Sequence, residues 1–217
     1  MRFESLCEST REDAKYLPGY SAFKVFMRHS IRFDNPPDGN YDNLLLTPEG
    51  IRAAEEIGRN LDLPIGRLYS SRVGRCVQTV RTIARANGIE QPVIHTEKPY
   101  SFLKYASYPF EVMGVGWYEY YYGLQRGIDK YTGGYTARDE AEPIIDKIFE
   151  DGGEPGTLDI ICSHDSHLVV LASALFDLKT GLKGENWVGY TEGLFLWGSR
   201  EDFHARFRGE ERHFRNW

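Results

Sequence analysis

The feature that most constrains the fold of this chain is an apolar run that leads directly into polar, chemically reactive side chains. Residues 158–162 read LDIIC, and Ser163, His164 and Asp165 follow at once. A nearly continuous apolar run of this length is typical of a strand that is buried on both faces. Residues 168–178 then have the apolar spacing of a helix. The segment therefore predicts a strand followed by a helix.

The alternation of an apolar, β-rich run with a helical segment recurs along the chain. The expected strands cover residues 22–27, 68–70, 92–94, 158–162 and 193–197. Residues 47–49, Thr-Pro-Glu, mark the start of a helix, because threonine caps well, proline loses no hydrogen bond at the first position and glutamate favours the positive end of the helix dipole. A further helix is expected from about residue 72 to residue 86. The pattern predicts an α/β fold, with the charged tail from Glu201 onward at its periphery.

The length and charge of the chain limit its organisation and its partners. With 217 residues, of which 41% are hydrophobic, residues 1–217 are expected to form a single domain. A formal net charge of −6 provides no positive field for nucleic acid or for an anionic membrane surface, so we expect neither as a partner. The first ten residues have no apolar run, and no stretch of the chain reaches the roughly eighteen apolar residues of a membrane span. The three cysteines lack the spacing of a metal site or a redox pair. These features predict a protein of the reducing cytoplasm.

The composition changes between residues 99 and 135. This segment holds nine of the fourteen tyrosines of the chain, together with Phe102, Phe110 and Trp117. We predict that residues 99–135 form an insertion or cap within the domain, over the site. Two interpretations stay open, because aromatic side chains can enclose a ligand or can simply pack a small subdomain against the main sheet.

Ionisable side chains gather after three of the expected strands. Residues 28–32 follow the first strand, residues 71–75 the second, and residues 163–165 a later one. Because the carboxyl ends of parallel strands lie along one edge of a sheet, we expect these segments to converge in one crevice. Guanidinium groups can orient phosphoryl oxygens, an imidazole can attack phosphorus, and a carboxylic acid can protonate the departing oxygen. The combination indicates a site for a phosphomonoester.

These motifs resemble those of the histidine phosphatase superfamily, which is marked by an Arg-His-Gly motif after the first strand and a second histidine after a later strand. Residues 28–30 match the first motif, with Ser30 in place of the usual glycine. Residues 68–79, LYSSRVGRCVQT, resemble the superfamily segment strand-Ser-x-x-x-Arg-x-x-x-Thr, which assigns a phosphate-binding arginine to Arg75. Residues 163–165 resemble the second-histidine motif of the acid-phosphatase branch, in which the aspartate donates a proton.

Weaker matches accompany these motifs. Arg32 stands where the acid-phosphatase branch has a further arginine, although Asp34 replaces the proline that follows it there. Asn35 stands where the mutase-like branch often has an asparagine phosphate ligand, and residues 47–50 resemble the helix opening of the family. The resemblance spans about residues 22–197, with the Tyr-rich insertion unmatched.

The resemblance implies a fold, a reaction and a set of site residues. The fold would be a three-layer α/β/α sandwich with a mostly parallel central sheet, as in phosphoglycerate mutase. The reaction would be hydrolysis of a small phosphorylated molecule or a phosphoprotein through a covalent phosphohistidine, with no cofactor and no metal. The implied roles are nucleophile for His29, phosphate binding for Arg28, Arg32, Arg75 and His164, and proton donation for Asp165.

Three alternatives to this interpretation stay open. In the mutase-like branch the proton donor is a glutamate of the middle segment, for which Glu119 and then Glu111 are the candidates. The chain would be a phosphoglycerate-type mutase if the phosphoryl group returned to the substrate instead of being transferred to water. It would be a non-catalytic binder of phosphorylated ligands if the fold were kept for recognition alone.

Other patterns in the sequence point away from metal and cysteine chemistry. His164 and His167 have an H-x-x-H spacing, but helical zinc sites use residues i and i+4, and the nearby arginines would repel a cation. Cys76 and Arg81 are separated by four residues, one fewer than in the C-x5-R loop of cysteine phosphatases. We expect His167 to lie on a helix surface. The histidines with no motif match, expected to be structural, are His95, His204 and His213.

Overall fold

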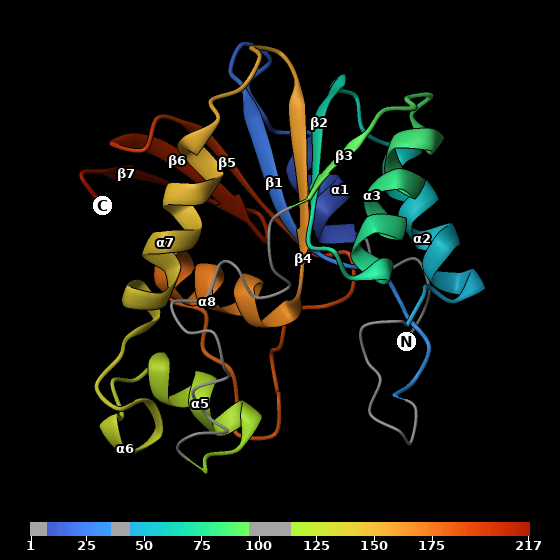
Figure 1. The fold of residues 1–217 in the computed structure, drawn as a ribbon. Coiled ribbons are helices and arrows are strands. Elements are labelled where there is room, and N and C mark those ends of the chain that lie inside the picture. The colour runs from blue at the N-terminus through green and yellow to red at the C-terminus, as the bar shows by residue number, and fades with distance from the viewer. Residues whose placement is uncertain (1–7, 36–43, 96–113) are drawn as a thin grey trace.

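The computed structural model describes residues 8–35, 44–95 and 114–217, and these contain one seven-stranded sheet with helices on both faces (Figure 1). The strands are β1 (Phe23–Arg28), β2 (Ile65–Ser70), β3 (Val93–His95), β4 (Leu158–Ser163), β5 (Gly193–Gly198), β6 (Asp202–Phe207) and β7 (Glu210–Arg215). The helices are α1 (Glu8–Ala14), α2 (Pro48–Arg59), α3 (Gly74–Ala86), α5 (Trp117–Leu124), α6 (Asp129–Thr132), α7 (Ala137–Glu150) and α8 (Asp165–Phe176).

The strands follow the order β3-β2-β4-β1-β5-β6-β7 across the sheet. The first four strands in this order are parallel, and β5, β6 and β7 are antiparallel to their neighbours. Since β1 and β4 are parallel and adjacent, the segments that leave their carboxyl ends begin side by side. The antiparallel β5 starts at this same edge, so the chain that enters β5 also reaches it.

Two hydrophobic cores separate the sheet from its helices. Along β1, Phe23, Val25 and Met27 belong to the core under α2 and α3, whereas Phe26 belongs to the core under α7 and α8. Every residue of β4 is buried, as the apolar run at 158–162 predicted. The expected three-layer sandwich with a mostly parallel centre is therefore confirmed, and Figure 1 shows the helix pairs on opposite sides of the sheet.

The expectation of a peripheral tail after Glu201 was wrong. Residues 202–207 and 210–215 form β6 and β7, which extend the sheet by two strands. Phe203, Ala205 and Phe207 are buried at alternate positions of β6. This period of two is the mark of a strand with one buried face, and the intervening charged residues concealed it in the sequence.

The described part of the Tyr-rich segment, residues 114–135, forms α5 and α6. In Figure 1 these helices lie beyond the carboxyl ends of the parallel strands, next to α8. Tyr121 of α5 is fully buried, and the Trp187 ring packs edge-on against both Tyr118 and Tyr121, with centroids 5.0 and 5.4 Å apart. The remaining residues of the segment, which include Glu111, lie outside the described residues. Within the described ranges, no helix has the length and apolar character needed to cross a membrane.

Candidate active site

The two motif histidines meet at the carboxyl edge of the sheet. Arg28 ends β1 opposite Ser163 at the end of β4, so the residues that follow, His29 and His164, leave the sheet side by side. Their rings lie edge to face with centroids 5.6 Å apart, and both side chains are buried. Arg75, in the first turn of α3, joins them from the next strand connection. The expected convergence of the three junctions is confirmed by these contacts.

The hydrogen bonds of His29 fix its proton on one ring nitrogen. Its Nδ1 lies 2.8 Å from the carbonyl oxygen of Ser30, which can only accept, and its Nε2 accepts from Nε of Arg75 at 3.1 Å. The lone pair of the neutral ring is therefore on Nε2. Burial lowers the pKa of His29 to about 3, and the neighbouring His164 and Arg75 act in the same direction. At neutral pH the ring is uncharged, and Nε2 is its unprotonated nitrogen.

Arg75 also approaches the second histidine. Its Nη2 lies 3.4 Å from Nδ1 of His164, while Nε2 of His164 lies 3.9 Å from the thiol of Cys76. Arg72, the other arginine of this junction, is exposed. The geometry therefore agrees with the sequence spacing, which favoured Arg75 over Arg72.

Ser30, the residue in place of the usual glycine, is held by two helices. Its hydroxyl donates to the Gly50 carbonyl of α2 at 2.7 Å, and its backbone N–H donates to Oγ1 of Thr79 in α3 at 3.0 Å. A Cβ on Gly50 would lie only 2.0 Å from the carbonyl oxygen of Ile31, so glycine is required for α2 to come this close. The serine hydroxyl is thus satisfied inside the fold and stabilises the loop that positions His29.

Arg28 and Asp165 form an ion pair at the front of the site. Nη2 of Arg28 lies 3.2 Å from Oδ2 of Asp165, and Nη1 donates to the Val188 carbonyl at 2.7 Å. The guanidinium also covers the ring of Tyr190 at 4.0 Å, and that ring lies 5.8 Å from His29. Oδ2 of Asp165 accepts a hydrogen bond of 3.1 Å from the Trp187 indole N–H.

The surroundings of Asp165 keep its carboxyl group ionised. Burial alone would raise the pKa of Asp165, but the Arg28 guanidinium, the Trp187 hydrogen bond and the two histidines together lower it below its usual value. The side chain is 24% exposed, so solvent reaches it. Asp165 is the first residue of α8, and the cap position belongs to His164. A helix cap is therefore not the role of this aspartate.

Sequence reasoning missed the loop that leads into β5. Trp187, Val188 and Tyr190 contact Arg28, His29 or Asp165. Their only signal in the sequence is the run WVGY before the last expected strand. The loop reaches the site because β5 is antiparallel to β1, which places its start beside the end of β1.

Several predicted residues lie apart from this cluster. Nη1 of Arg32 donates to the Phe33 carbonyl at 2.7 Å, and within the described ranges no hydrogen bond or ion pair joins it to His29 or its neighbours. Asp34 and Asn35 are exposed. Glu119 caps α5, where Oε2 accepts from the Gly116 N–H at 3.0 Å.

The expectation that His167 lies on a helix surface was wrong. Its side chain is fully buried, and its Nδ1 lies 3.3 Å from the hydroxyls of Ser163 and Ser166. The physical reason is that α8 is apolar around nearly its whole circumference and is covered on most sides. Elsewhere, His204 and His213 stack on each other across β6 and β7, with ring centroids 4.2 Å apart. In the described ranges no group of three His, Cys, Asp or Glu side chains is arranged to hold a metal ion.

Comparisons with known proteins give a family resemblance and a fold. Residues 25–98 match the family model of the histidine phosphatase superfamily (branch 1). The fold is similar to phosphoglycerate mutase from Bacillus anthracis, at 17% identity and a TM-score of 0.52, covering 89% of this chain and 92% of that one. It is also similar to mycobacterial glucosyl-3-phosphoglycerate phosphatase, at 15% identity and a TM-score of 0.50, covering 88% of this chain and 100% of that one. No curated protein sequence matches the chain.

The resemblance to the histidine phosphatase superfamily is therefore confirmed, and so is the phosphoglycerate mutase-like fold. The family match contains Arg28, His29 and Arg75. It ends before the second-histidine motif, so the roles of His164 and Asp165 depend on their contacts with the matched residues.

Proposed function

We propose that this chain is a metal-independent phosphomonoester hydrolase that forms a covalent phosphohistidine on His29. The observation that carries the proposal is the neutral Nε2 of His29, which faces the guanidinium of Arg75 in a buried cluster with Arg28 and His164. A phosphoryl group placed there meets a nucleophilic nitrogen and fixed positive groups at once. Such groups stabilise the charge on the equatorial oxygens of the transferring phosphoryl group.

In the first step, Nε2 of His29 forms a bond to phosphorus while the bond from phosphorus to the leaving oxygen breaks. Asp165 in its acid form gives its proton to that oxygen. In the second step, water attacks phosphorus, the Asp165 carboxylate takes a proton from the water, and the bond to His29 breaks. The Ser30 carbonyl holds the Nδ1 proton of His29 throughout and balances the positive charge that develops on the ring.

Substrate binding reconciles the acid role of Asp165 with its lowered pKa. In the free protein the Arg28 guanidinium pairs with Asp165 and favours the carboxylate. A dianionic phosphate bound beside Arg28 takes over that pairing and adds negative charge close to Asp165. Both effects raise the pKa of Asp165, so the carboxyl group gains a proton when the substrate is bound.

Hydrolysis of para-nitrophenyl phosphate from pH 4 to 9 with excess chelator tests this proposal. We expect turnover that the chelator does not reduce, because the proposed steps use only His29, Asp165 and the phosphate-binding groups. The same assay with a bisphosphorylated sugar acid added tests for a mutase, whose turnover this compound would prime. No hydrolysis at any pH, or turnover that only the sugar acid initiates, would contradict a hydrolase.

Trp187→Phe is expected to shift the pH profile without preventing turnover. The substitution keeps an aromatic ring against α5 but removes the N–H that donates to Asp165. Since that hydrogen bond lowers the pKa of Asp165, its loss raises the pKa, and the decline of kcat at high pH moves to higher pH. We expect kcat/KM for an alkyl phosphate to fall by up to about tenfold, since one hydrogen bond to a charged group is lost.

Tyr118→Phe is the matched control for Trp187→Phe. Tyr118 packs edge-on against the same indole, and its substitution leaves the N–H on Trp187 in place. We expect the pH profile of this control to coincide with that of the parent. A Trp187→Phe profile that also coincides with the parent would show that Trp187 does not position the acid.

A further inference from the structure

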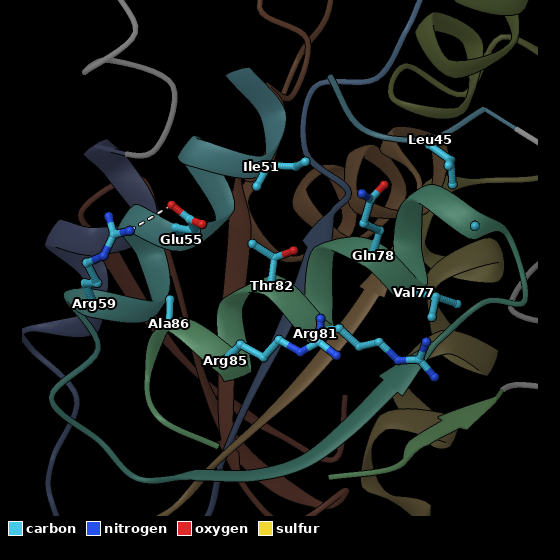
Figure 2. Close-up of a pocket in the computed structure, with 11 residues that line it drawn as sticks. Leu45, Ile51, Glu55, Arg59, Val77, Gln78, Arg81, Thr82, Arg85 and Ala86 are labelled. Carbon is cyan, nitrogen blue, oxygen red and sulfur yellow. Dashed lines mark hydrogen bonds and ion pairs between the residues drawn. The ribbon is translucent and has the colours of Figure 1, made fainter. Parts of the chain in front are cut away.

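A cavity lies on the outer side of the α2–α3 pair, away from the sheet. Its volume is about 690 Å³, and Figure 2 shows it as a groove along the two helices. Leu45, Ile51 and Val77 supply apolar surface. Arg59, Arg81 and Arg85 supply three guanidinium groups, with Glu55 as the one acidic side chain among the lining residues.

Two residues that line the groove are direct neighbours along the chain of residues that form or support the candidate active site. Gly74 lines the groove and is followed by Arg75, which binds His29. Ile51 lines the groove and follows Gly50, which holds Ser30. The groove then follows α3 from Gly74 to Arg85, a distance of about 16 Å at 1.5 Å per residue. An extended peptide of about five residues has this length.

The arginines along the groove form only weak, exposed ion pairs within the protein or none within the described ranges. Arg59 pairs with Glu55 at 2.7 Å and Arg85 pairs with Glu90 at 3.3 Å, and the side chains of both arginines are at least 60% exposed. Such exposed pairs contribute little and can exchange for carboxylates of a ligand. Arg81 is exposed and, within the described ranges, forms no ion pair. Arg81 and Arg85 also line a neighbouring cavity.

We propose that this groove binds an acidic segment of a phosphorylated protein substrate, whose phosphorylated side chain occupies the site at His29. The inference rests on the proposed phosphatase function and names its substrate class as a phosphoprotein. Guanidinium groups along the groove match carboxylates, and the apolar residues at the end near the site match an apolar side chain beside the phosphorylated residue. The net charge of −6 of the whole chain disfavours a long polyanion such as nucleic acid, whereas a short acidic segment fits the local positive charge of the groove.

The test compares a phosphopeptide carrying about five residues rich in Asp and Glu with para-nitrophenyl phosphate. Arg81→Glu is expected to lower kcat/KM for the acidic phosphopeptide by about tenfold, since an attraction becomes a repulsion. It is expected to leave kcat/KM for para-nitrophenyl phosphate unchanged, because Arg81 does not touch the site. Arg52→Glu, on α2 and outside the groove, makes the same change of charge and is expected to affect neither substrate. Equal effects of the two variants on the phosphopeptide would overturn the proposal.

A binding measurement separates failure of this inference from failure of the proposed function. The probe is a fluorescent acidic peptide of the same sequence without phosphate, titrated with the parent, Arg81→Glu and Arg52→Glu. We expect the parent and Arg52→Glu to bind it equally and Arg81→Glu to bind it about tenfold more weakly at low salt. If the peptide binds in this pattern but the protein has no phosphatase activity, the proposed function is rejected and the proposal that the groove binds an acidic segment stands. If the protein is an active phosphatase but the peptide binds all three forms equally, the proposed groove is rejected and the proposed function stands. The same holds if the peptide binds none of the three forms.

Discussion

His29→Ala is expected to abolish the hydrolysis of phosphomonoesters, with kcat/KM falling by about a thousandfold or more. The substitution removes the only protein atom that forms a bond to phosphorus in the proposed mechanism. Arg28, Arg75 and His164 remain, so the variant is expected to keep its affinity for inorganic phosphate. Steady-state kinetics with para-nitrophenyl phosphate measures the loss of kcat/KM. The affinity for inorganic phosphate is measured by competitive inhibition in the parent and by direct titration in the variant.

His204→Gln is the matched control for His29→Ala. His204 lies on β6 in the antiparallel half of the sheet, and its side chain is 37% exposed. Its substitution is expected to leave the kinetics unchanged. Rapid acid quenching followed by mass spectrometry is expected to find phosphate on the peptide that contains His29 in the parent and none in His29→Ala. Retention of more than about a tenth of the parent activity in His29→Ala would exclude the nucleophile assignment.

The junctions between strands and polar residues were predictable because local signals coincide there. At 158–165 a central parallel strand is buried on both faces and therefore consists mainly of apolar residues. The reactive side chains begin where this buried strand ends. The same contrast located His29 after β1 and Arg75 after β2. These positions depend on short-range patterns and on one rule about parallel sheets, both of which are readable from the chain.

The rest of the site depends on long-range contacts that no local pattern encodes. Trp187 and Tyr190 reach Asp165 and Arg28 only because β5 is antiparallel to β1, and the direction of β5 is not visible in its four apolar side chains. Arg32 has the expected spacing, yet its guanidinium donates to the adjacent Phe33 carbonyl. Spacing along the chain places a residue near a site but does not fix where a long side chain points.

Ser30 shows how a departure from a family pattern finds a physical explanation only in three dimensions. In the sequence, Ser30 stands in place of the usual glycine, and its side chain could change how closely the backbone approaches a bound phosphate. In the structure the added hydroxyl is directed to the Gly50 carbonyl of α2, and it lies inside the fold. The substitution therefore adds a hydrogen bond to the support of His29.

Asp165→Asn is expected to reduce the hydrolysis of alkyl phosphates by about a hundredfold to ten-thousandfold, and that of para-nitrophenyl phosphate by less than about tenfold. An alkoxide leaves poorly unless it is protonated, whereas para-nitrophenolate leaves without a proton. Asparagine keeps the size of the side chain and can still accept from the Trp187 N–H, but it has no proton to give. Comparison of kcat/KM for the two substrate classes in the parent and the variant measures this difference.

The pH dependence of the two substrates gives a second measure of the same role. In the free protein the pKa of Asp165 is held below its usual value, so the acid form is already the minor form at pH 4 and its fraction falls further as the pH rises. For the parent, kcat/KM for an alkyl phosphate is therefore expected to fall more steeply with rising pH than kcat/KM for the aryl phosphate. In Asp165→Asn the two profiles are expected to become parallel, because the group that distinguishes them no longer titrates.

Glu119→Gln decides between the two candidate proton donors. The Glu119 carboxylate caps α5 through the Gly116 N–H, and glutamine retains an oxygen that can accept this hydrogen bond. We expect Glu119→Gln to leave both substrate classes unaffected, since Asp165 is the acid that pairs with Arg28 at the site. A selective loss of alkyl phosphate hydrolysis in Glu119→Gln, together with an equal loss for both substrates in Asp165→Asn, would transfer the role of donor to Glu119. Asp165 would then act only by holding Arg28 in position for the phosphate.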